Sequence, residues 1–216
     1  MSEREGVIQY QLHHTETALP KDMNLSALNA WRSVFYKLGL IGQREDRYEG
    51  LGFGNVSQRL AANDHRFLIT GSQTGHLPTL GRDHFAIVDY ASPLDNVIQS
   101  YGPIPPSSEA LTHASVYQND SQAQAVIHVH SPEIWRQTFA LQLPFIDEEI
   151  AYGTVAMAQA VEDYLKSGQL QTRPIFTMLG HEDGIVAFGH CLSSAASTLI
   201  TQLAKAFEIE LKSLDI

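Results

Sequence analysis

The chain has 216 residues, a formal net charge of −10, 44% hydrophobic residues and 18% charged residues. Its length suits one compact domain, and its composition excludes a disordered chain. The negative charge argues against nucleic acid as a partner, because nucleic-acid-binding surfaces gather Lys and Arg. We therefore expect a single domain over residues 1–216 whose partner is a small molecule.

Two features bear on where the protein works. No apolar run reaches the roughly 18 residues of a membrane-spanning helix, and residues 1–6 lack the apolar core of a signal peptide. Cys191 is the only cysteine, so the chain forms no internal disulfide, and its place at the start of a helical pattern indicates packing rather than reactivity. We expect a cytoplasmic protein with no membrane partner.

The predicted elements in the first half are mostly strands. Alternating apolar and polar residues predict a half-buried strand over 6–14, and helical spacing predicts a helix from Asn24 as N-cap to the stop at Gly39. A glycine-rich loop is predicted over 48–57. Further strands are predicted over 67–70, which runs into Gly-Ser-Gln-Thr-Gly at 71–75, and over 85–90 and 96–101.

Helices are more frequent in the second half. Ser107 and Ser108 follow three prolines and begin a predicted helix with Glu109 in its first turn. Strands are predicted over 174–179 and 184–188, and helices over 131–139, 154–166 and 192–214. In the last helix the expected buried stripe is Leu199, Leu203, Ala206, Phe207 and Leu211.

Residues 125–130, Ala-Val-Ile-His-Val-His, predict a buried strand that carries two histidines. Side chains two apart on a strand share a face, so His128 and His130 project side by side and could bind one metal ion. The alternative is that each is a core histidine with its own hydrogen-bond partner. The residues alone leave both possibilities open.

Two other polar residues also have ordinary explanations. Glu109 could be only a carboxylate that favours a helix start, although free amides and serine hydroxyls at such a start also suit a phosphate. His181 lies on a predicted turn, where a histidine is usually solvated.

Five motifs follow one another along the chain: Gly54-Asn55-Val56-Ser57, Ile69-Thr70-Gly71-Ser72, Pro106-Ser107-Ser108-Glu109, His128-Val129-His130 and Leu179-Gly180-His181. Their order resembles the class II aldolase/adducin family, and the Ser-Ser-Glu and His-x-His motifs are the specific part. The resemblance covers roughly residues 24–212, which leaves 1–23 as an N-terminal extension. It implies an α/β fold, a three-layer α/β/α sandwich with a mainly antiparallel central sheet, and a homotetramer.

The resemblance also implies roles for individual residues. His128, His130 and His181 would bind one divalent metal ion per chain, expected to be Zn²⁺. Glu109 would be the general acid/base, and His113 would be structural. The phosphate pocket would be lined by Gly54, Asn55, Ser72, Ser107 and Ser108.

The sequence departs from the family pattern at three places. Gln73 stands where the family usually has glycine, and Glu182-Asp183 follow the third histidine, where the family has glycine at once. The segment between Pro144 and Tyr152 is short and lacks the residues that carry a substrate-contacting tyrosine in sugar-phosphate aldolases. We therefore expect a substrate other than the usual fuculose or ribulose phosphates.

The residue types explain the implied chemistry. Three neutral imidazoles leave a metal its full charge and an open position, so that a substrate can chelate it and form an enediolate. The expected function is a metal-dependent lyase that cleaves a small hydroxy-carbonyl compound, a sugar phosphate by resemblance, in a retro-aldol reaction. Epimerisation and dehydration pass through similar species, so both remain alternatives.

Three other protein classes fit the sequence less well. A cupin would need an all-β sequence and a glutamate placed later than Glu133, and a hydrolase of the His-x-His-x-Asp-His type would need ligands that residues 131–133 do not offer. The stronger rival is a non-catalytic scaffold like adducin, whose branch has lost the metal ligands. Retention of the three histidines and Glu109 favours an enzyme.

Overall fold

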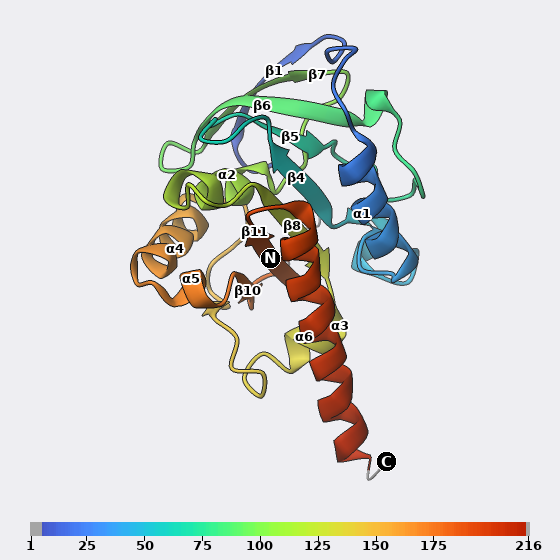
Figure 1. Cartoon of the computed structure of the whole chain (residues 1–216), viewed down its shortest axis with the longest axis vertical. Coiled ribbons are helices and arrows are strands. Elements are labelled where there is room, and N and C mark those ends of the chain that lie inside the picture. Colours follow the sequence, from blue (N-terminus) through green and yellow to red (C-terminus); the bar gives the residue numbers. More distant parts are fainter. Residues whose placement is uncertain (1–5, 215–216) are drawn as a thin grey trace.

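The computed structural model describes residues 6–214. Residues 1–5, which carry most of the N-terminal sequence considered for a signal peptide and part of the predicted extension, lie outside the described residues. Within this range, nine strands form one sheet (Figure 1). In spatial order they are β1 (Gln11–Glu16), β7 (Val97–Gly102), β6 (Phe85–Ser92), β5 (Phe67–Thr70), β4 (Asn55–Arg59), β8 (Ala125–His130), β11 (Gly184–Gly189), β10 (Ile175–Met178) and β9 (Phe145–Ile146).

The sheet is mixed, with an antiparallel majority. Only the outermost pairs, β1 with β7 and β9 with β10, run parallel among the strand pairs described. A separate ribbon is formed by β2 (Gly42–Gln43) and β3 (Gly52–Phe53), and short 3₁₀ turns cover Tyr48–Gly50 and Arg82–His84. In the antiparallel centre of the sheet, β8 lies between β4 and β11.

Helices cover both faces of the sheet (Figure 1). On one face, α2 (Ala110–Asn119), α4 (Val155–Lys166) and α5 (Gln169–Thr172) pack in one hydrophobic core. On the other, α1 (Ser26–Lys37), α3 (Pro132–Arg136) and α6 (Leu192–Ser213) pack in a second core. The predicted three-layer α/β/α sandwich is confirmed.

The alternation of side chains along β8 separates the two cores. Ala125, Ile127 and Val129 face the core of α1 and α6, whereas Val126 faces the core of α2 and α4. His128 and His130 have the same parity as Val126 and therefore point toward the α2 side. The pattern that predicted the strand thus also determines which layer the two histidines face.

Local signals explain several helix boundaries. The Thr154 hydroxyl accepts a hydrogen bond from the Met157 amide and caps α4, and the Ser131 hydroxyl caps α3 in the same way through Ile134. Gly39 follows α1 with a φ of +72°, a left-handed conformation that suits glycine. These ends agree with the sequence predictions within a few residues.

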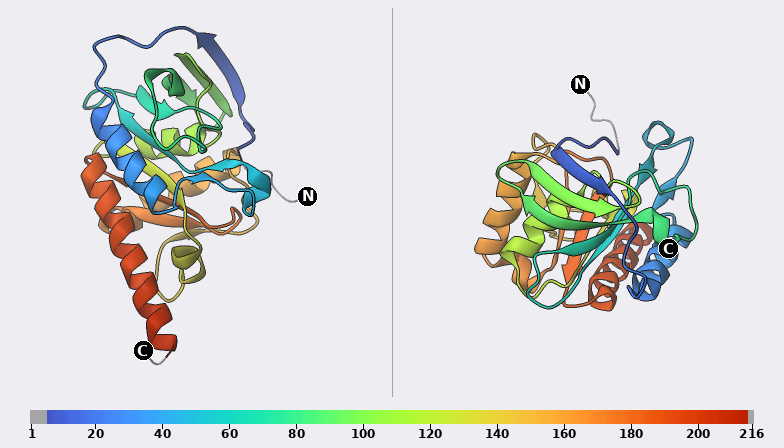
Figure 2. Two further views of the ribbon diagram at one scale, coloured as in Figure 1. Left: turned by 90° about the vertical axis from the view of Figure 1, so that its right-hand side faces the viewer. Right: turned by 90° about the horizontal axis from the view of Figure 1, so that it is seen from above.

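Three predictions need correction. The glycine-rich segment 48–57 is not a loop throughout, because β3 covers Gly52–Phe53 and β4 begins at Asn55. The first strand begins at Gln11, because the Val7 amide bonds to the Tyr152 hydroxyl instead of a neighbouring strand. In α6, Phe207 and Leu211 are not buried, with 44% and 48% of their surfaces exposed. Figures 1 and 2 show the reason: the C-terminal half of α6 projects beyond the sheet that it covers at its start.

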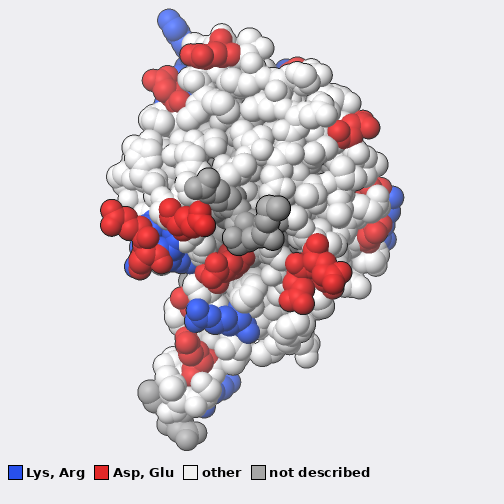
Figure 3. Space-filling view, turned by 180° about the vertical axis from the view of Figure 1, so that it is seen from behind, with Lys and Arg blue, Asp and Glu red and all other residues white. Residues whose placement is uncertain are grey.

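No helix within residues 6–214 is both long enough and apolar enough to cross a bilayer. Acidic side chains are spread over the face seen in Figure 3. The negative formal charge is therefore displayed broadly on that face.

Candidate metal and acid/base site

Three histidines converge at the end of β8. The Nε2 atoms of His128 and His130 lie 3.2 Å apart, and one ligand atom from each of His128, His130 and His181 lies within 4.8 Å of the others. His128 and His130 come from β8, and His181 comes from the turn between β10 and β11. The structure therefore brings together the three residues that the resemblance assigns to a metal.

The position of His181 depends on a glycine. Gly184 stands directly opposite His130 in the pairing of β11 with β8, and a Cβ atom at Gly184 would lie 2.6 Å from Cδ2 of His181. The missing side chain leaves room for the His181 ring to fold back over the strand. His181 is only 3% exposed, which excludes the ordinary alternative of a solvated turn histidine.

Burial keeps these imidazoles neutral. It lowers the pKa of His128 to about 4, against a weaker opposing effect of its contact with the Ile185 carbonyl. Burial, and then the neighbouring histidines, hold the pKa values of His130 and His181 well below their usual range. Neutral imidazole is the form that binds a metal, so the electrostatics suit the ligand role.

Glu109 faces the same cluster from the start of α2. It occupies the N-cap position rather than the first turn that the sequence predicted, and it is 1% exposed. Its Oε2 accepts a hydrogen bond of 3.0 Å from the Thr112 hydroxyl, and its Oε1 lies 3.8 Å from Nε2 of His181. The carboxylate is therefore held by one oxygen and directed toward the histidines by the other.

The five residues expected to bind phosphate line one small pocket. Gly54 lies between β3 and β4, and Asn55 begins β4. Ser72 follows β5, and Ser107 and Ser108 precede α2. Asn55 stands directly opposite His128 in the pairing of β4 with β8, so both side chains point to the same face of the sheet. This pocket therefore adjoins the histidine cluster.

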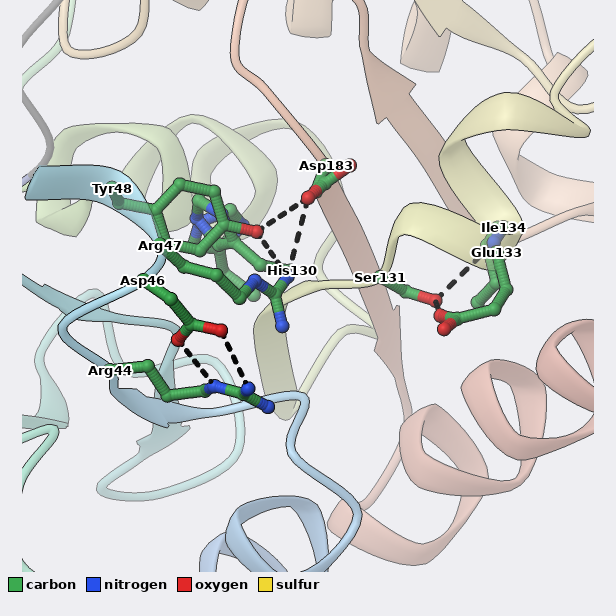
Figure 4. A network of polar contacts seen from close by, with 10 residues as sticks. Arg44, Asp46, Arg47, Tyr48, His130, Ser131, Glu133, Ile134 and Asp183 are labelled. Carbon is green, nitrogen blue, oxygen red and sulfur yellow. Dashed lines mark hydrogen bonds and ion pairs between the residues drawn. The ribbon is translucent and has the colours of Figure 1, made fainter.

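Sequence reasoning did not identify the residues that cover the cluster from the side of the β2–β3 ribbon. The Tyr48 ring packs against His130 with centroids 4.6 Å apart, and its hydroxyl donates a 2.6 Å hydrogen bond to Asp183 (Figure 4). Arg47 also contacts Asp183, with Nη2 3.3 Å from Oδ2. The presence of Glu182 and Asp183 directly after the third histidine was a signal in the sequence. The residues that contact Asp183 lie more than a hundred positions earlier in the chain, so the sequence did not show which they are.

Two further residues lie behind and beside the cluster. His113 is fully buried, and its Nδ1 lies 2.7 Å from the Ser57 hydroxyl, which agrees with the expected structural role. The Tyr152 ring packs on His181 with centroids 4.6 Å apart, and its hydroxyl donates to the Val7 carbonyl. Tyr152 thus links the N-terminal segment to the third histidine.

The fold and this cluster define an α/β protein with a buried three-histidine and carboxylate site. The chain belongs to the class II aldolase/adducin family: the family model described as class II aldolase and adducin N-terminal domain matches residues 44–211. No curated protein matches the sequence.

Solved structures of low sequence identity share the fold. L-fuculose-1-phosphate aldolase from Thermus thermophilus is 22% identical, with a TM-score of 0.63 over 88% of this chain and 93% of that chain. YgbL from Escherichia coli, provisionally described as an aldolase/epimerase/decarboxylase, is 20% identical, with a TM-score of 0.64 over 86% and 87%. A sugar-phosphate aldolase from Thermotoga maritima is 15% identical, with a TM-score of 0.62 over 88% and 94%.

Proposed function

We propose that the chain is a metal-dependent lyase that cleaves a small hydroxy-carbonyl compound by a retro-aldol reaction. The observation that carries this proposal is the buried carboxylate of Glu109, whose Oε1 lies 3.8 Å from Nε2 of His181 at the edge of the three-histidine cluster. An acid/base group beside a candidate metal site is the arrangement that such a cleavage needs.

The donor set fits a divalent ion. Three buried imidazoles with lowered pKa values offer neutral nitrogen ligands within 4.8 Å of one another. His128, His130 and His181 would hold the ion, and Zn²⁺ suits three such nitrogens. When bound, the ion supplies Lewis-acid polarisation of a substrate carbonyl.

The protein's own residues supply the rest. Retro-aldol cleavage breaks the C–C bond between the α and β carbons and moves one proton from the β-hydroxyl oxygen to the α carbon. Glu109 is the group placed to move a proton, because Thr112 fixes one carboxylate oxygen and leaves the other toward the histidines. The Tyr152 and Tyr48 rings cover the cluster and limit the access of water.

The family relationship supports this choice. Its solved members include aldolases and the protein with a provisional aldolase/epimerase/decarboxylase description. Epimerisation and dehydration use a similar site and are distinguished by the products formed. A non-catalytic scaffold would need no buried carboxylate directed at three histidines.

Two substitutions test the proposal. Glu109→Gln should retain about one divalent ion per chain and lose about 10²- to 10⁴-fold in turnover, the usual contribution of general acid/base catalysis. His128→Ala should lose both the ion and the turnover, because a ligand is removed. The measurements are elemental analysis of native protein and a product assay over hydroxy-carbonyl compounds with and without phosphate.

Glu162→Gln is the matched control, because Glu162 pairs with Lys166 on the surface of α4. It should keep both the ion and the activity. Turnover by Glu109→Gln equal to that of the wild type would rule out the proton-transfer role. Native protein without metal, or metal-loaded protein that converts none of the compounds, would favour the scaffold.

A further inference from the structure

The Gln73 side chain lies across the small pocket beside the histidine cluster. Its Oε1 accepts a 3.1 Å hydrogen bond from the Gly52 amide, and its Nε2 lies 3.5 Å from the Gly6 carbonyl oxygen. A Cβ atom on Gly6 would come within 1.9 Å of that Nε2. The amide of Gln73 therefore bridges the ribbon strand β3 and the N-terminal segment, in a space that exists because Gly6 has no side chain.

The pocket that remains is very small. Its volume is about 20 Å³. A single water molecule needs roughly 10–15 Å³ of such volume, so the space suits one or two non-hydrogen atoms. A space of this size suits the hydroxymethyl end of a substrate better than a phosphate group with its four oxygens.

The charges around the pocket also favour a neutral group. None of the described residues that line it carries a positive charge. The start of α2 would favour an anion, but the Glu109 carboxylate already stands at that helix end. Among the described residues that line the pocket, a phosphate dianion would therefore meet no cationic side chain, and it would lie near the Glu109 carboxylate.

Asn55 provides an acceptor for a hydroxyl. Its side chain lines the pocket and is 4% exposed, and its Oδ1, as the amide is oriented, is buried without a hydrogen-bond partner. A buried acceptor of this kind requires a donor. A substrate hydroxyl can donate to it, whereas the phosphate of a phosphorylated substrate has no proton to donate when it is a monoester dianion.

The backbone at Gln73 supports a functional role for the side chain. Its φ is +56°, in the left-handed region where glycine is favoured and a long side chain is uncommon. A strained residue beside a candidate site points to a role for its side chain.

We propose that Gln73 is a specificity residue that closes this pocket to phosphate and makes it a subsite for the neutral hydroxymethyl end of the substrate. The inference rests on the proposed function for the identity of the substrate. The exclusion of phosphate by Gln73 is a property of the pocket and can be measured without turnover.

The first experiment measures the binding of inorganic phosphate by calorimetry to the full-length chain, with any bound metal left in place. Gln73→Gly should bind phosphate at least tenfold more tightly than the wild type, because the amide bridge is removed and glycine accepts the backbone conformation. The same two proteins are also compared after chelation, so that binding of phosphate to the metal does not contribute. Equal dissociation constants in the two proteins would overturn the proposal.

Gln142→Gly is the matched control. Gln142 also has a positive φ, of +53°, but it lies on the loop before β9 and outside this pocket. It should bind phosphate as the wild type does. A gain equal to that of Gln73→Gly would show that relief of backbone strain, not opening of the pocket, causes the change.

The second experiment compares dihydroxyacetone with dihydroxyacetone phosphate, which share the hydroxy-carbonyl unit. With one aldehyde acceptor common to both reactions, the wild type should prefer the unphosphorylated donor in kcat/KM for aldol addition. Gln73→Gly should shift the ratio at least tenfold toward the phosphate. A wild type that prefers the phosphate would overturn the proposal. Absence of turnover with both compounds would count against the proposed function, and the phosphate-binding comparison would still decide on Gln73.

Discussion

Tyr48 packs against His130 while Asp183 fixes its hydroxyl (Figure 4). Burial, and then the hydrogen bond to Asp183, raise the pKa of Tyr48, so the phenol is a neutral donor over the working range of pH. Asp183 is 7% exposed and accepts from both Tyr48 and Arg47. The contact therefore satisfies a buried carboxylate and holds one wall of the histidine cluster.

Tyr48→Phe should lower the free energy of unfolding by about 1.5–3 kcal/mol, the usual contribution of a hydrogen bond to a charged group. The aromatic ring stays, so the metal content should not change. Urea denaturation measures the first quantity and elemental analysis the second. Tyr90→Phe, at a tyrosine that is 50% exposed, should have no effect on stability, and the same small effect for both variants would contradict the role of Asp183.

The site residues differ in how far the sequence could predict them. His128 and His130 follow from the two-residue period of a strand, which is a local property. The burial of His181 depends on the glycine opposite His130, and that pairing exists only in the folded sheet. The hydrogen bond between Tyr48 and Asp183 joins residues separated by 135 positions, which no local pattern predicts.

At the scale of elements, α6 is the helix whose apolar stripe is only partly covered. Its first turns pack in the core through Leu192, Ala195 and Leu199, whereas Phe207 and Leu211 lie on the projecting half (Figure 2). Periodicity predicts an apolar stripe but not what covers it. Two large apolar side chains near a helix end, left in solvent, are typical of a surface that contacts another subunit.

The homotetramer that the family resemblance implies would give this half of α6 a partner, and this expectation can be tested. Replacing Phe207 and Leu211 together by Asp should lower the mass measured by light scattering from that of a tetramer toward that of a monomer, because charge would enter an apolar interface. Leu94→Asp is the control, since Leu94 is 54% exposed on the turn between β6 and β7. A wild type that is monomeric at micromolar concentration would remove the basis for the tetramer.

For the whole molecule, buried histidines couple stability to pH. Burial is the main cause that lowers the pKa values of His113, His128, His130 and His181 in the folded state. The unfolded chain therefore binds more protons than the folded chain as the pH falls below 6.5. Stability is fully present above that value and is lost as the pH falls toward the folded pKa values.

The metal-free protein should accordingly become less stable between pH 7 and pH 4. The shift of His128 from 6.5 to about 4 corresponds to about 3 kcal/mol of unfolding free energy lost by pH 4. Urea denaturation at several pH values after chelation measures this loss. Stability that stays constant or rises as the pH falls from 7 to 5 would contradict it.

The three-layer architecture was easier to predict from the sequence than the order of the strands in the sheet. Runs of apolar residues and helical spacing located β8 and the long helices. An element that buries one or both of its faces has a periodic or continuous pattern of apolar residues, which can be recognised in a short stretch of sequence. The parallel pairing of β1 with β7, at the edge of the sheet, depends on contacts between distant segments. Apolar and polar residues also alternate over 6–10, so this segment was predicted as strand. In the structure it lies outside β1, and the Tyr10 hydroxyl donates a hydrogen bond to the Ser107 carbonyl near the site.

The left-handed backbone positions have a consequence for protein engineering. Among the described residues, seven that are not glycine have a positive φ, and four of them, Tyr48, Glu49, Gln73 and Asp183, belong to or adjoin the networks around the site. Glycine at such positions relieves strain and often stabilises a protein. At Tyr48 and Asp183 the loss of their partly buried hydrogen bond would oppose this gain, whereas the hydrogen bond of Gln73 to the Gly52 amide is exposed and would oppose it less. Selection of this protein for heat tolerance alone would therefore favour glycine at Gln73, which shapes the pocket, and a thermostable library should be screened for substrate preference at the same time.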